Sequence, residues 1–180
     1  GISSSFVIMA QAIEPDNFKK IILVNPSDIN IIREMPTKET NAAKTILEIP
    51  IIGTFIYNLI MHHKRIRNYI ESKYFFKKTF LSSKMEDTYF ESAHKGNSAG
   101  KYLLASTKGN YVNIDITNAV KKADNLYIIS SRERNNAVAI TEKYLHLNKN
   151  IEATYISNSR YLPQLETPDK FKDIVLMFLQ

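Results

Sequence analysis

Three short, largely apolar runs stand out along the chain, each of a length suited to a strand. They are KKIILVN at residues 19–25, LYIISS at 126–131 and EATYIS at 152–157. Amphipathic helical patterns separate them. Apolar strands that alternate with amphipathic helices imply a parallel sheet covered on both faces, and we expect the strands to pair in that chain order.

The helical patterns lie on either side of these runs. Apolar residues recur at helical spacing in three segments: Phe6, Met9, Ala10 and Ile13; Ala137, Ile140, Tyr144 and Leu147; and Phe171, Ile174, Val175, Phe178 and Leu179. Pro15 ends the first segment. The last segment follows Thr167, a predicted N-cap, and Pro168, which suits a first helical turn. The fold class predicted is therefore α/β, a parallel sheet flanked by helices.

The middle of the chain has a different pattern. Residues 31–124 contain no comparable strand and predict several helices, among them 86–94 and 99–106. One apolar stripe comprises Ile52, Phe55, Ile56, Leu59 and Ile60. A helical insertion between two strands of a parallel sheet is the layout of a cap over a ligand site. We therefore assign residues 1–30 and 125–180 to the core and 31–124 to an inserted helical cap.

Composition narrows the possible functions. The chain has 180 residues, 44% of them apolar, a net charge of +6 and no cysteine. Without cysteine there is no disulfide, thiol catalysis or thiolate metal site. The basic residues form no stripe beside a recognisable motif, which argues against nucleic acid. The longest apolar segment, 46–61, is shorter than a membrane span, and no signal peptide is visible, so we expect a cytoplasmic protein.

Two motifs resemble those of the α/β-hydrolases. Residues 1–5, GISSS, look like the nucleophile elbow G-x-S-x-G, with Ser5 in place of the last glycine. The last strand of that family runs into a loop of the form small-x-x-His-x-Pro-x-x-Glu-x-Pro before the final helix. Here residues 158–168 read NSRYLPQLETP. The order of strands, helices and insertion matches as well, so the resemblance covers the whole chain.

The resemblance implies a catalytic site of the esterase or lipase type. It assigns Ser3 as the nucleophile and the backbone N–H of Ser4 as an oxyanion donor, with a small apolar or ester-like ligand and no cofactor or metal. Arg160 occupies the position of the catalytic histidine. Arginine stays protonated in proteins and cannot take a proton from serine, so we expect weak hydrolysis or none.

The chain has four histidines that could be considered as a replacement for the missing catalytic base. His62, His63 and His94 lie in the insertion, and His146 lies in a helix before the last strand. His94, next to the Gly96 loop, is the one candidate for a replacement base. A surface or packing role is the favoured interpretation for each of the four.

The acid has two candidates. Glu133 follows the 126–131 strand, where most of the family places its acid, although neighbouring arginines would also hold it in a surface ion pair. Asp28 follows the 19–25 strand, where some members place theirs, and an aspartate there is also a common helix cap. We expect the Arg160 side chain to point toward Ser3 and to pair with one of these carboxylates.

Three functions remain open at this point. The first is a hydrolase with a degenerate triad, and the second is a ligand-binding protein in which Arg160 pairs with an anionic group. The third uses the Ile52–Ile60 stripe as a membrane-surface or partner-binding helix, for which a packed cap helix is the favoured alternative. Because an elbow normally follows a strand, we also expect a preceding half of the sheet, in a longer chain or a second chain.

Overall fold

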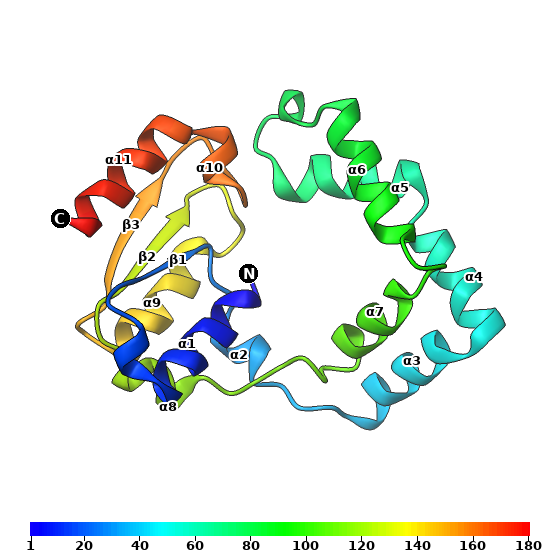
Figure 1. The fold of residues 1–180 in the computed structure, drawn as a ribbon, viewed down its shortest axis with the longest axis horizontal. Helices are drawn as coiled ribbons and strands as arrows, with labels where there is room; N and C mark the ends of the chain where they lie inside the picture. Colours follow the sequence, from blue (N-terminus) through cyan, green and yellow to red (C-terminus); the bar gives the residue numbers. More distant parts are fainter. The chain divides into compact units, whose positions relative to one another are not determined.

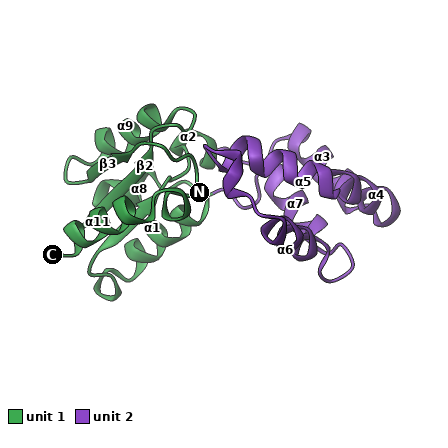
Figure 2. Ribbon diagram, turned by 90° about the horizontal axis from the view of Figure 1, so that it is seen from above, with its two compact units in different colours: residues 1–33, 114–180 green, residues 34–113 purple.

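The computed structural model describes residues 1–180 and divides them into two compact units. Unit 1 comprises Gly1–Arg33 and Ile114–Gln180, and unit 2 comprises Glu34–Asn113 (Figure 2). The helical insertion is therefore narrower than the 31–124 expected from the sequence. Residues 114–124 belong with the sheet because Ile116, Ala119 and Val120 pack into its core.

Unit 1 is built on a three-stranded parallel sheet. The strands β1 (Ile21–Val24), β2 (Leu126–Ser131) and β3 (Glu152–Ile156) pair in the order β1-β2-β3 (Figure 1). Leu23 lies opposite Ile128, and Ile129 lies opposite Thr154. Every residue of β2 is buried, as expected of a central strand. The predicted strands, their parallel pairing and their order are confirmed.

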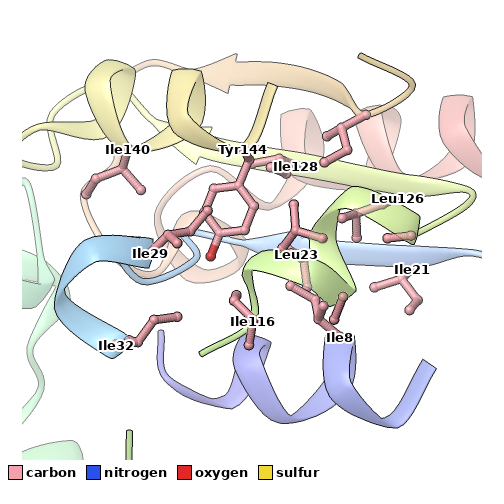
Figure 3. Packing of buried hydrophobic residues seen from close by; sticks show 14 residues of the cluster. Ile8, Ile21, Leu23, Ile29, Ile32, Ile116, Leu126, Ile128, Ile140 and Tyr144 are labelled. Carbon is pink, nitrogen blue, oxygen red and sulfur yellow. The ribbon is translucent and has the colours of Figure 1, made fainter. Parts of the chain in front are cut away.

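The helices of unit 1 cover both faces of this sheet. They are α1 (Ser3–Ile13), the 3-10 turn η1 (Pro15–Asn17), α2 (Ile29–Ile32), α8 (Thr117–Lys122), α9 (Ala137–Leu147), α10 (Pro163–Glu166) and α11 (Pro168–Leu179). On one face, Ile8 of α1 and Tyr144 of α9 pack with Leu23 and Ile128 (Figure 3). Val120 of α8 belongs to the same cluster. This cluster is the main core of unit 1.

The other face of the sheet is covered by α11. A second cluster consists of Tyr127, Ile129 and Ile156 from the strands, packed by Phe171, Ile174, Val175 and Phe178 of the helix. The predicted apolar face of the last helix is thus confirmed except for Leu179, which is 54% exposed. Thr167 precedes α11 as expected, but its hydroxyl donates to the Pro163 carbonyl rather than capping the helix.

Helix α1 buries only part of the face that its apolar spacing predicted, because Met9 packs against the core but two other members of that face do not. Phe6 and Ile13 are exposed, whereas Ser4, Ser5, Ile8 and Gln11 are the buried residues. Ile8 enters the main core, and the Gln11 side-chain amide donates to the Asp124 carbonyl at 2.8 Å. These two contacts with the rest of unit 1 set which side of α1 faces the sheet. The apolar spacing within the helix does not determine it alone.

Unit 2 is helical throughout, as predicted for the middle of the chain. It comprises α3 (Lys38–Glu48), α4 (Pro50–Ile60), α5 (His63–Tyr69), the π-helical turn η2 (Ile70–Tyr74), the 3-10 turn η3 (Lys78–Phe80), α6 (Ser83–His94) and α7 (Gly100–Lys108). No single helix is long and apolar enough to cross a membrane. The helices α3 and α4 taken together have the length and composition of a membrane span, but the two helices are bent by 96° relative to each other.

The apolar stripe of α4 is not the face that this helix buries. Phe55 is 69% exposed and Ile52 52%, whereas Gly53 and Tyr57 are the buried residues of the helix. Gly53 packs so tightly that a Cβ added there would lie 1.8 Å from the Leu47 carbonyl oxygen. The expectation that the apolar stripe of α4 packs on a core is therefore wrong. The backbone of α4 approaches the Leu47 carbonyl so closely that only glycine fits there, and this puts the Gly53 side of the helix inside.

Polar contacts join the helices of unit 2. The Tyr57 hydroxyl donates to the Ala93 carbonyl at 2.6 Å, and Lys101, only 6% exposed, donates to Thr54 Oγ1 at 3.0 Å. A further buried group is the carboxylate of Glu86, which lies 2.7 Å from His63 Nδ1 and 3.4 Å from an Arg67 nitrogen. The interior of unit 2 is thus partly polar.

Candidate active site

The loops that follow the three strands meet at the carboxyl edge of the sheet in unit 1. The side chains of Asn25 and Ser159, from the loops after β1 and β3, and of Ser131, the last residue of β2, are all buried. The Asn25 amide nitrogen donates to Ser131 Oγ at 3.0 Å, and Ser159 Oγ donates to the same hydroxyl at 2.9 Å. This edge is where open α/β sheets place their ligand sites.

Asn25 organises this edge, and sequence reasoning did not single it out. Its backbone is left-handed, with φ of 48°, which asparagine tolerates better than most residues. Its side-chain oxygen accepts from the Ser131 N–H at 2.8 Å, and its amide nitrogen also lies 3.2 Å and 3.1 Å from the carbonyls of Arg160 and Tyr161. From the sequence, the Asn25-Pro26 pair predicted only the end of the first strand and not these hydrogen bonds.

The segment with the predicted nucleophile reaches the same edge. The Gly1 nitrogen donates to the Asn25 carbonyl at 2.7 Å, so Asn25 contacts both this segment and the backbone of Arg160. Ser3 is exposed and is the first residue of α1, with no positive φ. The sharp, strained backbone typical of a nucleophile elbow is therefore absent at Ser3 in this structure.

The two serines after Ser3 are buried. The Ser4 hydroxyl donates to the Gly1 carbonyl at 2.6 Å, and the Ser4 N–H donates to the same carbonyl at 3.1 Å. The predicted oxyanion donor is thus engaged within the segment itself. Ser5 is fully buried, and its hydroxyl has no hydrogen-bond partner. Such an unpaired group costs about 1–3 kcal/mol, which a glycine at this position would avoid.

Asp28, the first acid candidate, is held by a cation. It caps α2 by accepting from the Asn30 N–H, and its carboxylate lies 2.7 Å from Lys143 Nζ of α9. Partial burial disfavours the charged form, but the hydrogen bonds from Lys143 and Asn30, with the charges of Lys143 and Arg134, leave the pKa of Asp28 below its usual value. Both the capping and the ion-pairing roles are visible here.

Glu133, the second acid candidate, supports the loop that carries Arg160. Its two carboxylate oxygens accept from the backbone N–H groups of Asn158 and Ser159, at 2.9 Å and 3.2 Å. Glu133 therefore lies next to the loop that carries Arg160, as its place after the 126–131 strand predicted. The carboxylate thus holds the backbone of that loop.

A third carboxylate, Glu166, was part of the recognised motif but was not assigned a role. It is 7% exposed and accepts from the Arg160 backbone N–H at 2.8 Å. Glu166 stands where the motif has its glutamate, so the signal for it was present in the sequence. Between Glu133, Glu166 and Asn25, the backbone on both sides of Arg160 is fixed.

Arg134 and Tyr144 lie under the same loops. Arg134 is 7% exposed, donates to the Pro26 carbonyl at 2.7 Å and stacks 5.1 Å from the centre of the Tyr161 ring. Its Nε has no hydrogen-bond partner. Burial raises the pKa of Tyr144 well above its usual value, so its hydroxyl stays protonated and donates to the Ser27 carbonyl.

The histidines occupy other places. His94 packs against Phe90 and Tyr57 in unit 2, with Nδ1 2.9 Å from the Phe90 carbonyl, and His63 contacts Glu86 and Asp87. His146 of α9 lines a hollow of about 680 Å³ beside α2 and α8. No cluster of three or more histidines and carboxylates exists in residues 1–180 that could hold a metal.

This arrangement of sheet, helices and loops is found in solved structures. A serine hydrolase from Cycloclasticus zankles superposes with a TM-score of 0.66 at 13% identity, over 97% of this chain and 60% of that one. A meta-cleavage product hydrolase from Pseudomonas fluorescens gives 0.68 at 13%, with the same coverage. The chain has the α/β-hydrolase fold.

A third structure extends the comparison. The 2-hydroxy-6-oxo-6-phenylhexa-2,4-dienoate hydrolase from Rhodococcus matches with a TM-score of 0.68 at 12% identity, over 97% of this chain and 60% of that one. The chain therefore spans about 60% of the length of these α/β-hydrolase-fold enzymes. No family model and no curated protein matches its sequence.

Proposed function

We propose that this chain is an α/β-hydrolase-like protein of the esterase or lipase type with a degenerate triad, and that by itself it has little or no hydrolytic activity. The observation that carries the proposal is the place of Arg160. It stands in the loop between β3 and α10, with its backbone held by Glu166 and Asn25, where the resemblance puts the catalytic histidine.

The chemistry of this position supports the proposal. A general base must release and regain a proton near the working pH, and a guanidinium, which stays protonated in proteins, does not. His146, the one histidine of unit 1, lies beside α2 and α8, and Ser3 lacks the backbone strain of an elbow. The two predicted acids are engaged by Lys143 and by loop N–H groups instead.

The test is activity-based labelling of the 180-residue chain with a fluorophosphonate, beside an active serine hydrolase. We expect no labelling that depends on Ser3, so wild type and Ser3→Ala should give the same background. Turnover of p-nitrophenyl butyrate and of 2-hydroxy-6-oxo-6-phenylhexa-2,4-dienoate should likewise be unaffected by Ser3→Ala. Labelling that disappears in Ser3→Ala would contradict the proposal.

A second variant sharpens the test. Arg160→His restores the residue type of a base without supplying an elbow or a second oxyanion donor. Because oxyanion donors each contribute about 10²–10³ in rate, we expect no robust esterase activity from this change alone. Rapid turnover by Arg160→His would show that the remaining site is complete.

A second candidate function is binding of a small organic anion without hydrolysis, with Arg160 as the sequence-based choice of cation. Arg134 favours this class independently, because it is a buried guanidinium that forms no direct ion pair, although the charge of Asp28 lies close enough to interact with it. Buried charges are normally paired. Titration with benzoate should be weakened by Arg134→Met but unaffected by Arg132→Met, a neighbouring exposed arginine; equal binding by both variants would exclude this role for Arg134.

A further inference from the structure

A second cavity lies entirely within unit 2, and none of the residues of the candidate active site lines it. It has a volume of about 660 Å³, is open to solvent on one side, and is lined by residues of the end of α4, of α5 and η2, and of α6 and α7. Ligand sites for small molecules usually measure about 300–1,000 Å³. The cavity is therefore large enough for a small organic molecule.

The wall of this cavity is apolar and aromatic. Its side chains include Ile60, Ile66, Ile70, Tyr69, Tyr74 and Tyr89. Ile66 and Ile70 are buried, and the rings of Tyr69 and Tyr74 meet edge to face, with centres 5.8 Å apart. Such a surface stabilises the apolar body of a ligand by removing it from water.

The charged residues at this cavity are all of one sign. Arg65 and Lys108 line it, and no acidic residue does. Both cations are exposed, so they lie at the mouth of the cavity rather than in its apolar wall. Neither has a carboxylate partner, whereas the nearby Arg67 is engaged by Glu71 and Glu86. The mouth is thus suited to a negative group.

The wider charge of unit 2 points the same way. Residues 34–113 contain 12 basic and 7 acidic residues, a net charge of +5 out of the +6 of the whole chain. Such an excess attracts anions over distances of about one Debye length, roughly 8–10 Å. From the wall, the mouth and this charge we propose that the unit 2 cavity binds an amphipathic organic anion, an apolar body that ends in one carboxylate.

The test uses decanoate as the probe, titrated calorimetrically into the 180-residue chain below the concentration at which decanoate forms micelles. We expect binding that decyltrimethylammonium, the same chain with a cationic head, does not show. The double variant Arg65→Glu/Lys108→Glu should weaken decanoate binding at least about tenfold, because both charges that attract the carboxylate are reversed. Lys64→Glu, a single charge reversal on an exposed neighbour outside the cavity, should stay within about twofold of wild type.

A second pair of variants tests the location without changing the cations. Leu104 lines the cavity, whereas its neighbour Leu103 is 67% exposed and does not. Leu104→Glu should abolish binding, and Leu103→Glu should preserve it, provided that circular dichroism shows each variant folded. No decanoate binding by wild type, equal binding of the cationic probe, or an equal decrease in affinity for Lys64→Glu and Arg65→Glu/Lys108→Glu would overturn the proposal.

Discussion

The two units of this chain differ in how they bury their apolar residues. Of the 24 buried hydrophobic residues, 18 belong to unit 1 and six to unit 2. Of the 23 large hydrophobic residues that are exposed, nine belong to unit 1 and 14 to unit 2. Unit 1 is therefore held mainly by a sheet with an apolar cluster on each face.

Unit 2 joins its helices through polar contacts to a greater extent. Tyr57, Lys101 and Glu86 are buried, and each bonds or pairs with a group on another helix. Unit 2 also carries a net charge of +5, against +1 for unit 1 with its 12 basic and 11 acidic residues. This difference predicts that shortening buried apolar side chains should lower the stability of unit 1 most. Removing the charge of a buried, paired side chain should lower the stability of unit 2 most.

The largest effect is expected from shortening the centre of the sheet. Ile128 is fully buried in β2, between Leu23 and Ala153 of the neighbouring strands. Ile128→Ala should lower the free energy of unfolding by about 4 kcal/mol, because it leaves a cavity in a packed core. Hydrogen exchange should show reduced protection in unit 1.

The matched control for that change lies in unit 2. Phe55 is 69% exposed, so Phe55→Ala should change stability by less than about 0.5 kcal/mol. If Phe55→Ala were as damaging as Ile128→Ala, the stripe of α4 would be part of a core, and the contrast between the units would be wrong.

A smaller but still large effect is expected at the loops of unit 1. Asn25→Ala removes the partner of the Ser131 N–H and of the Arg160 and Tyr161 carbonyls, so it should cost about 3 kcal/mol in urea unfolding. Asn30→Ala, at an exposed position in α2, is the control and should be nearly neutral. A neutral Asn25→Ala would mean that water replaces these bonds and that the edge is not rigid.

The polar interior of unit 2 can be tested at Glu86. Glu86→Gln keeps the shape but removes the charge that pairs with His63 and Arg67, and it should cost about 2 kcal/mol. Glu91→Gln, on the exposed face of α6, should cost almost nothing. Because Glu86 is buried, raising the salt concentration should change the cost of Glu86→Gln only slightly.

The smallest effect is expected at Asp28, and it depends on pH. Asp28→Asn keeps an effective cap on α2 but removes the ion pair with Lys143, at a cost of about 1 kcal/mol at pH 7. Because the folded pKa of Asp28 is lowered, its contribution is present above the unfolded value and is lost as the pH falls through the folded one. Thermal melts of both proteins should therefore converge in acid; a difference that persists there would assign the effect to packing.

The elements of unit 1 could largely be predicted from the sequence. The runs at 19–25, 126–131 and 152–157 became β1, β2 and β3 because an unbroken apolar run can be buried on both faces only inside a layered sheet. The spacing of Phe171, Ile174, Val175 and Phe178 likewise predicted the face of α11 that covers β2 and β3. Local pattern and tertiary packing agree at these positions.

The functional residues were predicted only in part. The motif at residues 158–168 located the Arg160 loop, and the resemblance placed Ser3, Asp28, Glu133 and Arg160 near one edge of a sheet. Contacts show which groups hold that edge: Asn25 and Glu166, with Glu133 bonded to the loop backbone. Nothing local in the sequence distinguishes such a buried hydrogen bond from a turn residue, because the partner lies more than 100 positions away in the case of Asn25.

By itself the sequence determined the strands, the helical nature of residues 34–113 and the arginine in place of a histidine, because each of these depends on residue type and near neighbours. Only the tertiary structure decided which face each helix buries. It turned α4 toward Gly53 and Tyr57, against the apolar stripe of that helix, and in α1 it buried Ile8 and Gln11 while leaving Phe6 and Ile13 of the stripe exposed. Backbone approach and buried hydrogen bonds are properties of two packed segments, and a single segment cannot specify them.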